Sequence, residues 1–410
     1  MKLLTELTDY LMDFQKVRAF QEFCGVKENT STYGRITNED ENLVNNCCEE
    51  THQCFDNGAA DLHYKSTKTC FETKKTTETP KLTPKQYEKT YVITNWFLYY
   101  LFKFGSTLGH EIFYITFVPC IFWNFDPFIG RKMVVVWVVT MYIGQALKDI
   151  LQWPRPTWPP VFKLETRVAA EYGLPSTHAV AGTTFPFSML MAMYNRYDFP
   201  LEIGVTLACS WCLLVACSRL YVGMHSIMDV LAGISLAATY LWLGWPFMDM
   251  VEEYTMTSTF APWIIIISHF LLGVFYPGTE HYSTSRGDTV IILAAGAGIH
   301  CASWFLYQYG IYFGPTGELP YTFAYPTFAS LGRSALRTIL GLVILFMVRM
   351  VVKTVSLFLI CHAVGVSKND RQARQRKDVE ITYKFVTYAF VGFFALALIP
   401  IFFDYINLTH

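Results

Sequence analysis

Apolar residues gather in long runs along the chain after residue 90, separated by short polar stretches. Each run was compared with the roughly 20 residues that an α-helix needs to cross the hydrocarbon core of a bilayer. The runs do not alternate apolar and polar residues with a period of two, as the strands of a membrane barrel would. The pattern therefore predicts an all-α, polytopic transmembrane helical bundle of about nine or ten helices. The predicted spans are 92–107, 109–127, 132–152, 178–195, 201–218, 225–247, 262–276, 289–309, 335–361 and 384–406.

The first 90 residues are polar and contain one amphipathic segment. Between Leu3 and Val26 the apolar residues recur at helical spacing, which predicts a short helix with one apolar face. Such a helix could lie on a membrane surface, dock on another part of the chain or form a dimer contact. Residues 27–89 are rich in Thr, Asn, Glu, Lys and Asp, so we expect them to be disordered.

The composition fits a membrane protein and argues against several partners. Of the 410 residues, 52% are hydrophobic, 17% aromatic and only 16% charged, whereas a soluble domain carries about 25% charged residues. The formal net charge of −1 provides no basic field for nucleic acid. The lipid bilayer is therefore the first predicted partner, and no sequence signal indicates an oligomeric state. Cys209 and Cys212 lie inside an apolar run, where small packing residues explain them better than a metal or redox site.

Three short stretches beside the apolar runs carry polar and charged side chains, which are unfavourable near a bilayer unless they have a role. In the first stretch Lys148 lies near the end of a run, and Arg155 follows seven residues later, which returns to nearly the same helix face. Pro154 and Pro156 then end the helix. The two cations are expected to point the same way at the membrane surface, either in an anion site or as a positive anchor.

The second stretch opens an apolar run with Ser176, Thr177 and His178. Ser176 is a favourable N-cap residue, and His178 falls in the first helical turn. A helix start presents unpaired N–H groups and the positive end of the helix dipole, which suits a phosphate. Taken alone, the same pattern is also explained by simple helix capping.

The third stretch contains Arg219, His225 and Asp229. His225 begins another run and Asp229 follows four residues later, so the two are predicted to share one helix face. The carboxylate can then accept a hydrogen bond from one imidazole nitrogen and leave the other unprotonated and directed outward. A histidine oriented in this way serves as a nucleophile or base. A His–Asp pair within a membrane can also relay protons in a transporter.

All three stretches are expected at one face of the membrane, because the run 178–195 leads away from that face and the run 201–218 returns to it. Three cations, two histidines and one carboxylate then converge. Phosphoryl transfer without a metal requires this set: the cations neutralise the phosphate oxygens, one histidine attacks and the other protonates the leaving group. We therefore expect the site to use neither a metal nor a cofactor.

The three stretches together resemble the signature of the type 2 phosphatidic acid phosphatase superfamily, which reads Lys-x6-Arg-Pro, Pro-Ser-x-His and Ser-Arg-x5-His-x3-Asp in this chain. The resemblance implies that His225 is the nucleophile, that Asp229 orients it and that His178 is the general acid for the leaving alkoxide. It also implies that the phosphate is held by Lys148, Arg155, Ser176, Thr177 and Arg219. Most members have Gly in place of Thr177. A Thr there would strain the backbone if a positive φ were required, or it would narrow the pocket and contribute to substrate choice.

From Asn95 onward the wider sequence is similar to one family of this superfamily, the sphingosine-1-phosphate phosphatases. The similar stretches are 153–156, 159–161, 163–165, 175–178, 285–289 and 294–298, together with 15–17 and 23–26. The resemblance implies that the substrate is sphingosine 1-phosphate, or its dihydro or phyto form, and that a phosphohistidine intermediate forms. It also implies a location in the endoplasmic reticulum membrane with the active site facing the lumen.

On this interpretation the chain divides into a polar tail (1–90), a phosphatase core with all three motifs (91–250) and additional C-terminal transmembrane helices (251–410). Counting spans from a lumenal site puts the basic loop 367–384 in the lumen, against the positive-inside preference. Two other functions stay open. One is a broad-specificity lipid phosphate phosphatase acting on phosphatidate or lysophosphatidate, and the other is a non-catalytic multipass protein that binds or transports lipid. The second is disfavoured because each motif side chain is present.

Overall fold

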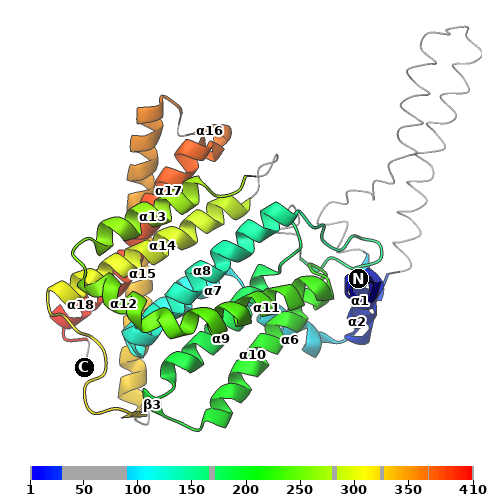
Figure 1. Cartoon of the computed structure of the whole chain (residues 1–410), viewed down its shortest axis with the longest axis horizontal. Helices are drawn as coiled ribbons and strands as arrows, with labels where there is room; N and C mark the ends of the chain where they lie inside the picture. The colour runs from blue at the N-terminus through cyan, green and yellow to red at the C-terminus, as the bar shows by residue number, and fades with distance from the viewer. Residues whose placement is uncertain are drawn as a thin grey trace, which may run out of the picture.

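A computed structural model describes residues 2–29, 90–165, 171–278, 284–323, 327–367 and 369–408, and helices dominate it (Figure 1). In this part of the chain, strands are limited to two short pairs. β1 (Val26–Glu28) pairs antiparallel with β2 (Tyr91–Ile93), and β3 (Tyr197–Asp198) pairs parallel with β4 (Tyr321–Thr322). The prediction of an all-α fold is confirmed. Residues 30–89, which belong to the predicted disordered tail, lie outside the described residues.

Six helical segments within the described residues are long and apolar enough to cross a membrane. Four are single helices: α8 (Pro127–Leu151), α10 (Leu201–Tyr221), α14 (Thr284–Gln308) and α15 (Phe328–Val364). The fifth joins α11 (Ile227–Gly244), a 3-10 turn (Trp245–Phe247) and α12 (Met248–Thr257). The sixth joins α17 (Lys377–Phe393), a π-helical turn (Phe394–Leu398) and α18 (Ile399–Tyr405).

The remaining helices in the apolar part of the chain are shorter. They are α6 (Trp96–Thr107), α7 (Glu111–Asn124), α9 (Thr177–Met193), α13 (Ala261–Val274) and the five-residue α16 (Arg371–Gln375). Each of the ten predicted spans contains a helix, but α6, α7, α9 and α13 are shorter than the roughly 20 residues that cross a bilayer. The chain is a multi-pass membrane protein.

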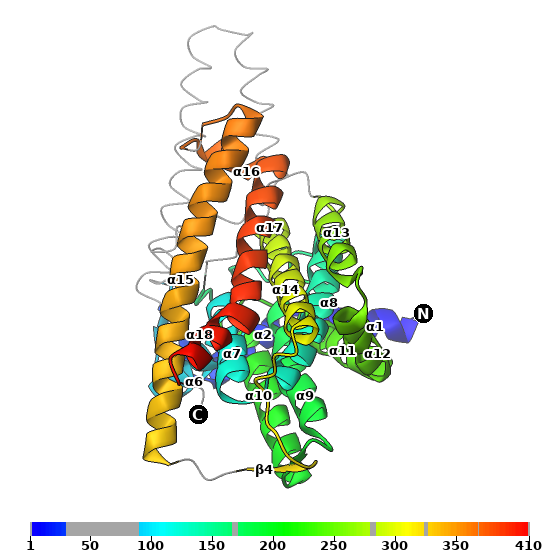
Figure 2. The same cartoon turned by 90° about the vertical axis from the view of Figure 1, so that its left-hand side faces the viewer.

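Two helices of the C-terminal half differ strongly in their surroundings. The most apolar stretch of α14 is 72% buried inside the protein, whereas that of α15 is only 11% buried. Two glycines bring α14 and α17 into close contact: a Cβ on Gly298 would lie 2.0 Å from the Ala389 carbonyl oxygen, and one on Gly392 would lie 2.3 Å from that of Ala295. Such small residues let helix backbones approach closely in membranes. Helix α14 is therefore a central element, while α15 lies at the outside beside α17 (Figure 2).

The N-terminal amphipathic segment forms two helices that dock on the rest of the chain. They are α1 (Lys2–Met12) and α2 (Phe14–Phe23), and Asp13 between them caps α2 by accepting a hydrogen bond from the N–H of Gln15. Helix α2 contacts α10, and the β1–β2 pair ties the segment to the start of the apolar region. Of the three roles left open for this segment, the structure therefore supports docking on the same chain.

The beginning of α8 carries a cluster of paired charges, here named the start cluster. Asp126 caps α8, lies 2.6 Å from Arg196 Nε and accepts a hydrogen bond from the Tyr197 hydroxyl. Arg131 donates to Glu252 on α12 (2.9 Å). The neighbouring Lys132 pairs with Asp249, also on α12. The start cluster therefore comprises Asp126, Arg131, Lys132, Arg196, Tyr197, Asp249 and Glu252.

Candidate active site

The last turn of α8 carries Lys148, and the helix stops with Gln152 as a C-cap in the left-handed conformation (φ 51°). The helix therefore ends before Pro154, and the prediction that Lys148 and Arg155 share a helical face was wrong, because Arg155 lies in the loop beyond the helix. The two side chains nevertheless meet at one carboxylate. Lys148 Nζ lies 3.2 Å and Arg155 Nη2 3.5 Å from Oε2 of Glu171.

Ser176 caps α9, as predicted, and links the second motif to the third. Its Oγ accepts a hydrogen bond from the N–H of Ala179 (3.4 Å), and its own N–H donates to the carbonyl oxygen of Asp229 (2.9 Å). Thr177 is the first residue of α9 and does not have a positive φ, so the backbone strain considered for this position is absent. Its hydroxyl instead accepts a hydrogen bond from Lys148 Nζ (3.3 Å).

Arg219 lies in the last turn of α10 and is completely buried. Its Nη1 donates to Ser106 Oγ on α6 (2.8 Å) and lies 3.2 Å from Glu165 Oε2. Within the described residues, Nε and Nη2 of Arg219 have no hydrogen-bond partner. A buried guanidinium with two unused nitrogens is suited to an anionic ligand, since charged donors bind phosphate strongly.

His225 lies in the turn between α10 and α11, one residue before the N-cap Ser226. The assumption that His225 belongs to the helix was therefore wrong. Its Nδ1 is 3.6 Å from Asp229 Oδ2, which is longer than a hydrogen bond. Asp229 Oδ2 instead accepts a hydrogen bond from the N–H of Ser226 (2.8 Å) in a capping box. The carboxylate does lie beside the imidazole, but the helix cap fixes its position.

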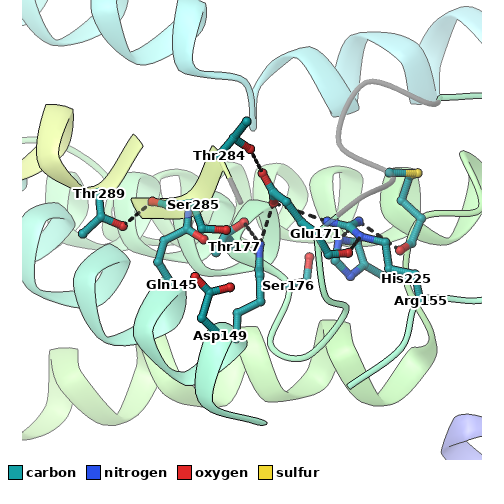
Figure 3. A network of polar contacts seen from close by, with 12 residues as sticks. Gln145, Asp149, Arg155, Glu171, Ser176, Thr177, His225, Thr284, Ser285 and Thr289 are labelled. Atoms are coloured by element: carbon teal, nitrogen blue, oxygen red, sulfur yellow. Dashed lines mark hydrogen bonds and ion pairs between the residues drawn. The ribbon is translucent and has the colours of Figure 1, made fainter. Parts of the chain in front are cut away.

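The other imidazole nitrogen of His225 faces a cation. His225 Nε2 lies 3.1 Å from Nη1 of Arg155 (Figure 3). A guanidinium can only donate hydrogen bonds, so Nε2 is the unprotonated nitrogen in this contact. Burial, with the positive charges of Arg155 and Arg219, holds the pKa of His225 well below its usual range, while burial lowers the pKa of Arg155 to about 10. A neutral imidazole therefore lies against a charged guanidinium at neutral pH.

His178 occupies the first turn of α9, beside a histidine that none of the motifs contains. The rings of His110 and His178 lie 5.2 Å apart between centroids and nearly perpendicular, at 87°. Nε2 of His110 lies 3.7 Å from Glu165 Oε1. Gly109 allows this packing, because a Cβ there would lie 2.3 Å from Cδ2 of His178. The second motif histidine is thus packed against the start of α7.

Two buried glutamates in the loop between α8 and α9, Glu165 and Glu171, are the main site residues that the motifs do not include. Burial alone would raise the pKa of Glu171, but Lys148 and the Thr284 hydroxyl lower it overall. Burial would also raise the pKa of Glu165, but Arg219 and His110 outweigh this effect and lower the pKa overall. Both carboxylates are therefore ionised at neutral pH and neutralise the cations. In the sequence both lie between the first and the second motif, and Glu165 also belongs to the similar stretch 163–165.

A glutamine of the N-terminal segment holds two of the site loops together. Gln21 is completely buried on α2, and its Nε2 donates to the carbonyl oxygens of Phe162 (2.8 Å) and Tyr221 (2.9 Å). Its Oε1 accepts a hydrogen bond from the N–H of Phe162 (3.0 Å). Nearby, Lys163 Nζ donates to the carbonyl oxygen of Gly223 (2.8 Å), and burial lowers the pKa of Lys163 to about 7. Helix α2 therefore positions the loop that carries Arg155 and the turn that carries His225.

A cavity of about 210 Å³ lies beside these residues and has two chemically different ends. Its polar end is lined by Arg155, Glu165, Glu171, Thr177 and His178. Its apolar wall is lined by Tyr114, Trp137, Met141 and Ile292. The wall formed by α14 also contributes Thr284 and Asp288, so a helix of the C-terminal half completes the cavity. A ligand with an anionic head and an apolar chain matches this division.

Comparison with known proteins agrees with this geometry. The model of the PAP2 superfamily matches residues 129–253, which run from α8 to α12 and contain all three motifs. This part of the chain is therefore a PAP2 domain. No solved structure matches the chain.

Several curated proteins are similar over most of the chain. Sphingosine-1-phosphate phosphatase 1 of Rattus norvegicus is 44% identical over 319 residues, which are 77% of this chain and 74% of the relative. Sphingosine-1-phosphate phosphatase 2 of Homo sapiens is 39% identical over 327 residues, 79% of this chain and 82% of the relative. Lipid phosphate phosphatase delta of Arabidopsis thaliana is 29% identical, over 42% of this chain and 44% of the relative. The chain belongs to the sphingosine-1-phosphate phosphatase family.

Proposed function

We propose that this protein hydrolyses sphingosine 1-phosphate, and its dihydro and phyto forms, to the long-chain base and inorganic phosphate. The observation that carries the proposal is the contact of His225 Nε2 with Arg155 (3.1 Å), which itself meets Lys148 at Glu171. A candidate nucleophile and a cationic phosphate clamp therefore form one network at the polar end of a cavity with an apolar wall. The names of the close relatives support the same substrate.

The phosphate is held by side chains from all three motifs. Lys148, Arg155 and Arg219 neutralise its oxygens, and the two unused nitrogens of Arg219 are donors for it. Ser176 and Thr177 lie at the start of α9, where the helix dipole favours an anion. In this position the charge that develops on the phosphoryl oxygens in the transition state is also stabilised.

Catalysis then proceeds in two displacements. His225 Nε2 attacks phosphorus, the bond to the lipid oxygen breaks, and His178, which enters this step as the imidazolium beside the bound phosphate, transfers its proton to the departing alkoxide and becomes neutral. Asp229, beside Nδ1, stabilises the positive charge that the phosphorylated imidazole acquires. In the second step His178 accepts a proton from a water molecule, the water attacks phosphorus, and inorganic phosphate leaves as His225 is regenerated.

One experiment tests both the substrate and the chemistry. Phosphate release by the purified protein is measured in EDTA with sphingosine 1-phosphate and with phosphatidate. We expect full activity in EDTA and a clear preference for sphingosine 1-phosphate. Loss of activity in EDTA would contradict the metal-independent mechanism. Equal rates on both lipids would favour a broad-specificity lipid phosphate phosphatase, and no turnover of either would favour the non-catalytic alternative.

We also propose that the protein lies in the endoplasmic reticulum membrane with its active site toward the lumen. The family resemblance supports this orientation. The basic residues of 369–376 lie at the same end as the site, since Arg286 of α14 donates to the Gln375 carbonyl oxygen while Thr284 of the same turn contacts Glu171. The positive-inside preference therefore favours the opposite orientation. A glycosylation sequon engineered into 369–376 distinguishes the two orientations. Glycosylation of this sequon in microsomes supports a lumenal active site. A folded, active protein that is not glycosylated there contradicts it.

A further inference from the structure

Ionised carboxylates inside an anion-binding site need an explanation, because they compete with the ligand for the same cations. Glu171 is the clearest case. Its Oε2 lies within 3.5 Å of both Lys148 Nζ and Arg155 Nη2, and its side chain is only 8% exposed. A dianionic phosphate bound by the same two cations must lie next to this carboxylate. With no compensating positive charge, the two would repel each other.

Glu171 is held from its other side by the first turn of α14. Oε1 of Glu171 accepts a hydrogen bond from the Thr284 hydroxyl (2.6 Å), as Figure 3 shows. Thr284 lines the cavity together with Asp288, one turn further along, and with Ile292, one turn beyond that. The carboxylate therefore lies in the polar end of the cavity, beside the two cations and the first turn of α14. When a lipid phosphate binds these cations, the carbons nearest the phosphate must lie close to Glu171.

The proposed substrate differs from phosphatidate and lysophosphatidate at these carbons. Sphingosine 1-phosphate carries a primary ammonium group on the carbon next to the one that bears the phosphate, and only one oxygen and two carbons separate phosphorus from nitrogen. The glycerol-based lipids carry an ester or hydroxyl oxygen there. A carboxylate beside the phosphate clamp would attract the ammonium group of the first kind of lipid, whereas in the second kind its repulsion of the phosphate stays uncompensated.

We propose that Glu171, supported by Thr284, forms a subsite for the primary ammonium group of the lipid and thereby selects sphingoid-base phosphates. The inference rests on the proposed function. In the free protein the carboxylate neutralises Lys148 and Arg155. When substrate binds, the phosphate takes over these cations and the released carboxylate pairs with the ammonium group. Selection then has an attractive and a repulsive component, as specific sites often do.

The test compares three substrates with the purified full-length protein at neutral pH: sphingosine 1-phosphate, its N-acetyl derivative, which lacks the charge, and lysophosphatidate. We expect the wild type to prefer the first by at least tenfold in kcat/KM. In Glu171→Gln the preference should fall at least tenfold, mainly through a higher KM for sphingosine 1-phosphate and a lower KM for lysophosphatidate. Thr284→Val, which keeps the carboxylate but removes its support, should lower the preference by a smaller factor.

Glu165→Gln is the matched control, because Glu165 lies in the same loop with similar exposure (11%) but pairs with Arg219. We expect it to change all three rates by a similar factor. Equal effects of Glu171→Gln on all substrates, or equal turnover of the N-acetyl derivative by the wild type, would overturn the ammonium subsite while leaving the phosphatase function intact. If the wild type fails to hydrolyse sphingosine 1-phosphate, the proposed function itself is refuted. If Glu171→Gln does not fold, the substrate preference of Thr284→Val tests the subsite instead: an unchanged preference would overturn the proposal.

Discussion

The two ends of α8 carry similar numbers of charged side chains but use them differently. At its beginning, the start cluster pairs each cation with its own carboxylate: Arg196 with Asp126, Arg131 with Glu252 and Lys132 with Asp249. About 30 Å away, near the end of the helix, Lys148 and Arg155 share one carboxylate.

Unused polar atoms mark the same difference. Within the described residues, buried nitrogens of Arg219, His178 and His225 have no hydrogen-bond partner, whereas no side-chain atom of the start cluster is in this state. Buried polar groups are normally satisfied, so the unused nitrogens at the site end are available to a ligand. In the described part of the chain, buried atoms without a partner also occur away from the site, in Trp211 and His300 for example. The start cluster therefore has charges that join helices to one another, whereas the site end has charges that are available to bind a phosphate.

Removal of the nucleophile should produce the largest effect at the site end. We expect His225→Ala to lower kcat by at least about 10⁴-fold, because no neighbouring group can replace the attacking nitrogen. The thermal unfolding midpoint in detergent should stay near that of the wild type. Phosphate release, together with detection of the phosphorylated protein after an alkaline quench, measures the outcome. Substantial residual turnover would mean that another residue is the nucleophile.

The opposite behaviour is expected for the start cluster. Asp126→Ala leaves Arg196 without its carboxylate and removes the cap of α8, which should destabilise the fold by about 3 kcal/mol. The kcat of the protein that remains folded should not change. Asp126→Asn, which can still cap the helix, should lose less stability. A large fall in kcat at unchanged stability would contradict the purely structural role of the start cluster.

The site end should also reveal a pH dependence of stability. The pKa of Lys163 is lowered to about 7 in the folded protein, against about 10.4 in an unfolded chain. From pH 7 to about 10 the unfolded chain binds more protons at this position, so stability rises with pH by up to about 3 kcal/mol. Lys163→Met should remove this rise, which unfolding measured at several pH values can detect. An identical pH profile in the variant would contradict the lowered pKa.

The smallest expected effect concerns the N-terminal segment. Gln21→Ala removes the three hydrogen bonds that hold the Arg155 loop and the His225 turn. Because small displacements of reacting groups slow catalysis, we expect kcat to fall about tenfold with little change in KM. Gln15→Ala, at an exposed position of the same helix, is the control and should behave as wild type. If both variants keep full activity, α2 is only a structural attachment.

The sequence was most informative where chemistry and local structure coincide. The apolar runs predicted each membrane helix, because lipid requires long uninterrupted apolar stretches. The cap at Ser176 could also be predicted, since a helix start is determined by a few neighbouring residues. The relative position of Lys148 and Arg155 could not be predicted from helical spacing, because Gln152 adopts a left-handed conformation and ends the helix before Arg155. The contact of His225 with Asp229 was expected from a helical spacing that begins only at Ile227.

The other site residues depend on contacts between distant parts of the chain. Gln21 reaches partners 141 and 200 residues away, and Glu171 meets Thr284 across 113 residues. No local spacing encodes such contacts. The role of α14 could not be predicted from the sequence either. Its apolar run indicates only another membrane span, whereas its first turn completes the cavity.

The length of helix α15 affects how the protein fits membranes of different thickness. Its 37 residues span about 55 Å, whereas the hydrocarbon core of a bilayer measures about 30 Å. The excess must be accommodated by tilting or by protruding beyond the lipid, at a fraction of a kcal/mol per ångström of mismatch. Because α15 is the least buried of the long helices, its tilt is the least constrained by packing. We therefore expect hydrophobic mismatch to displace α15 more than α8 or α14.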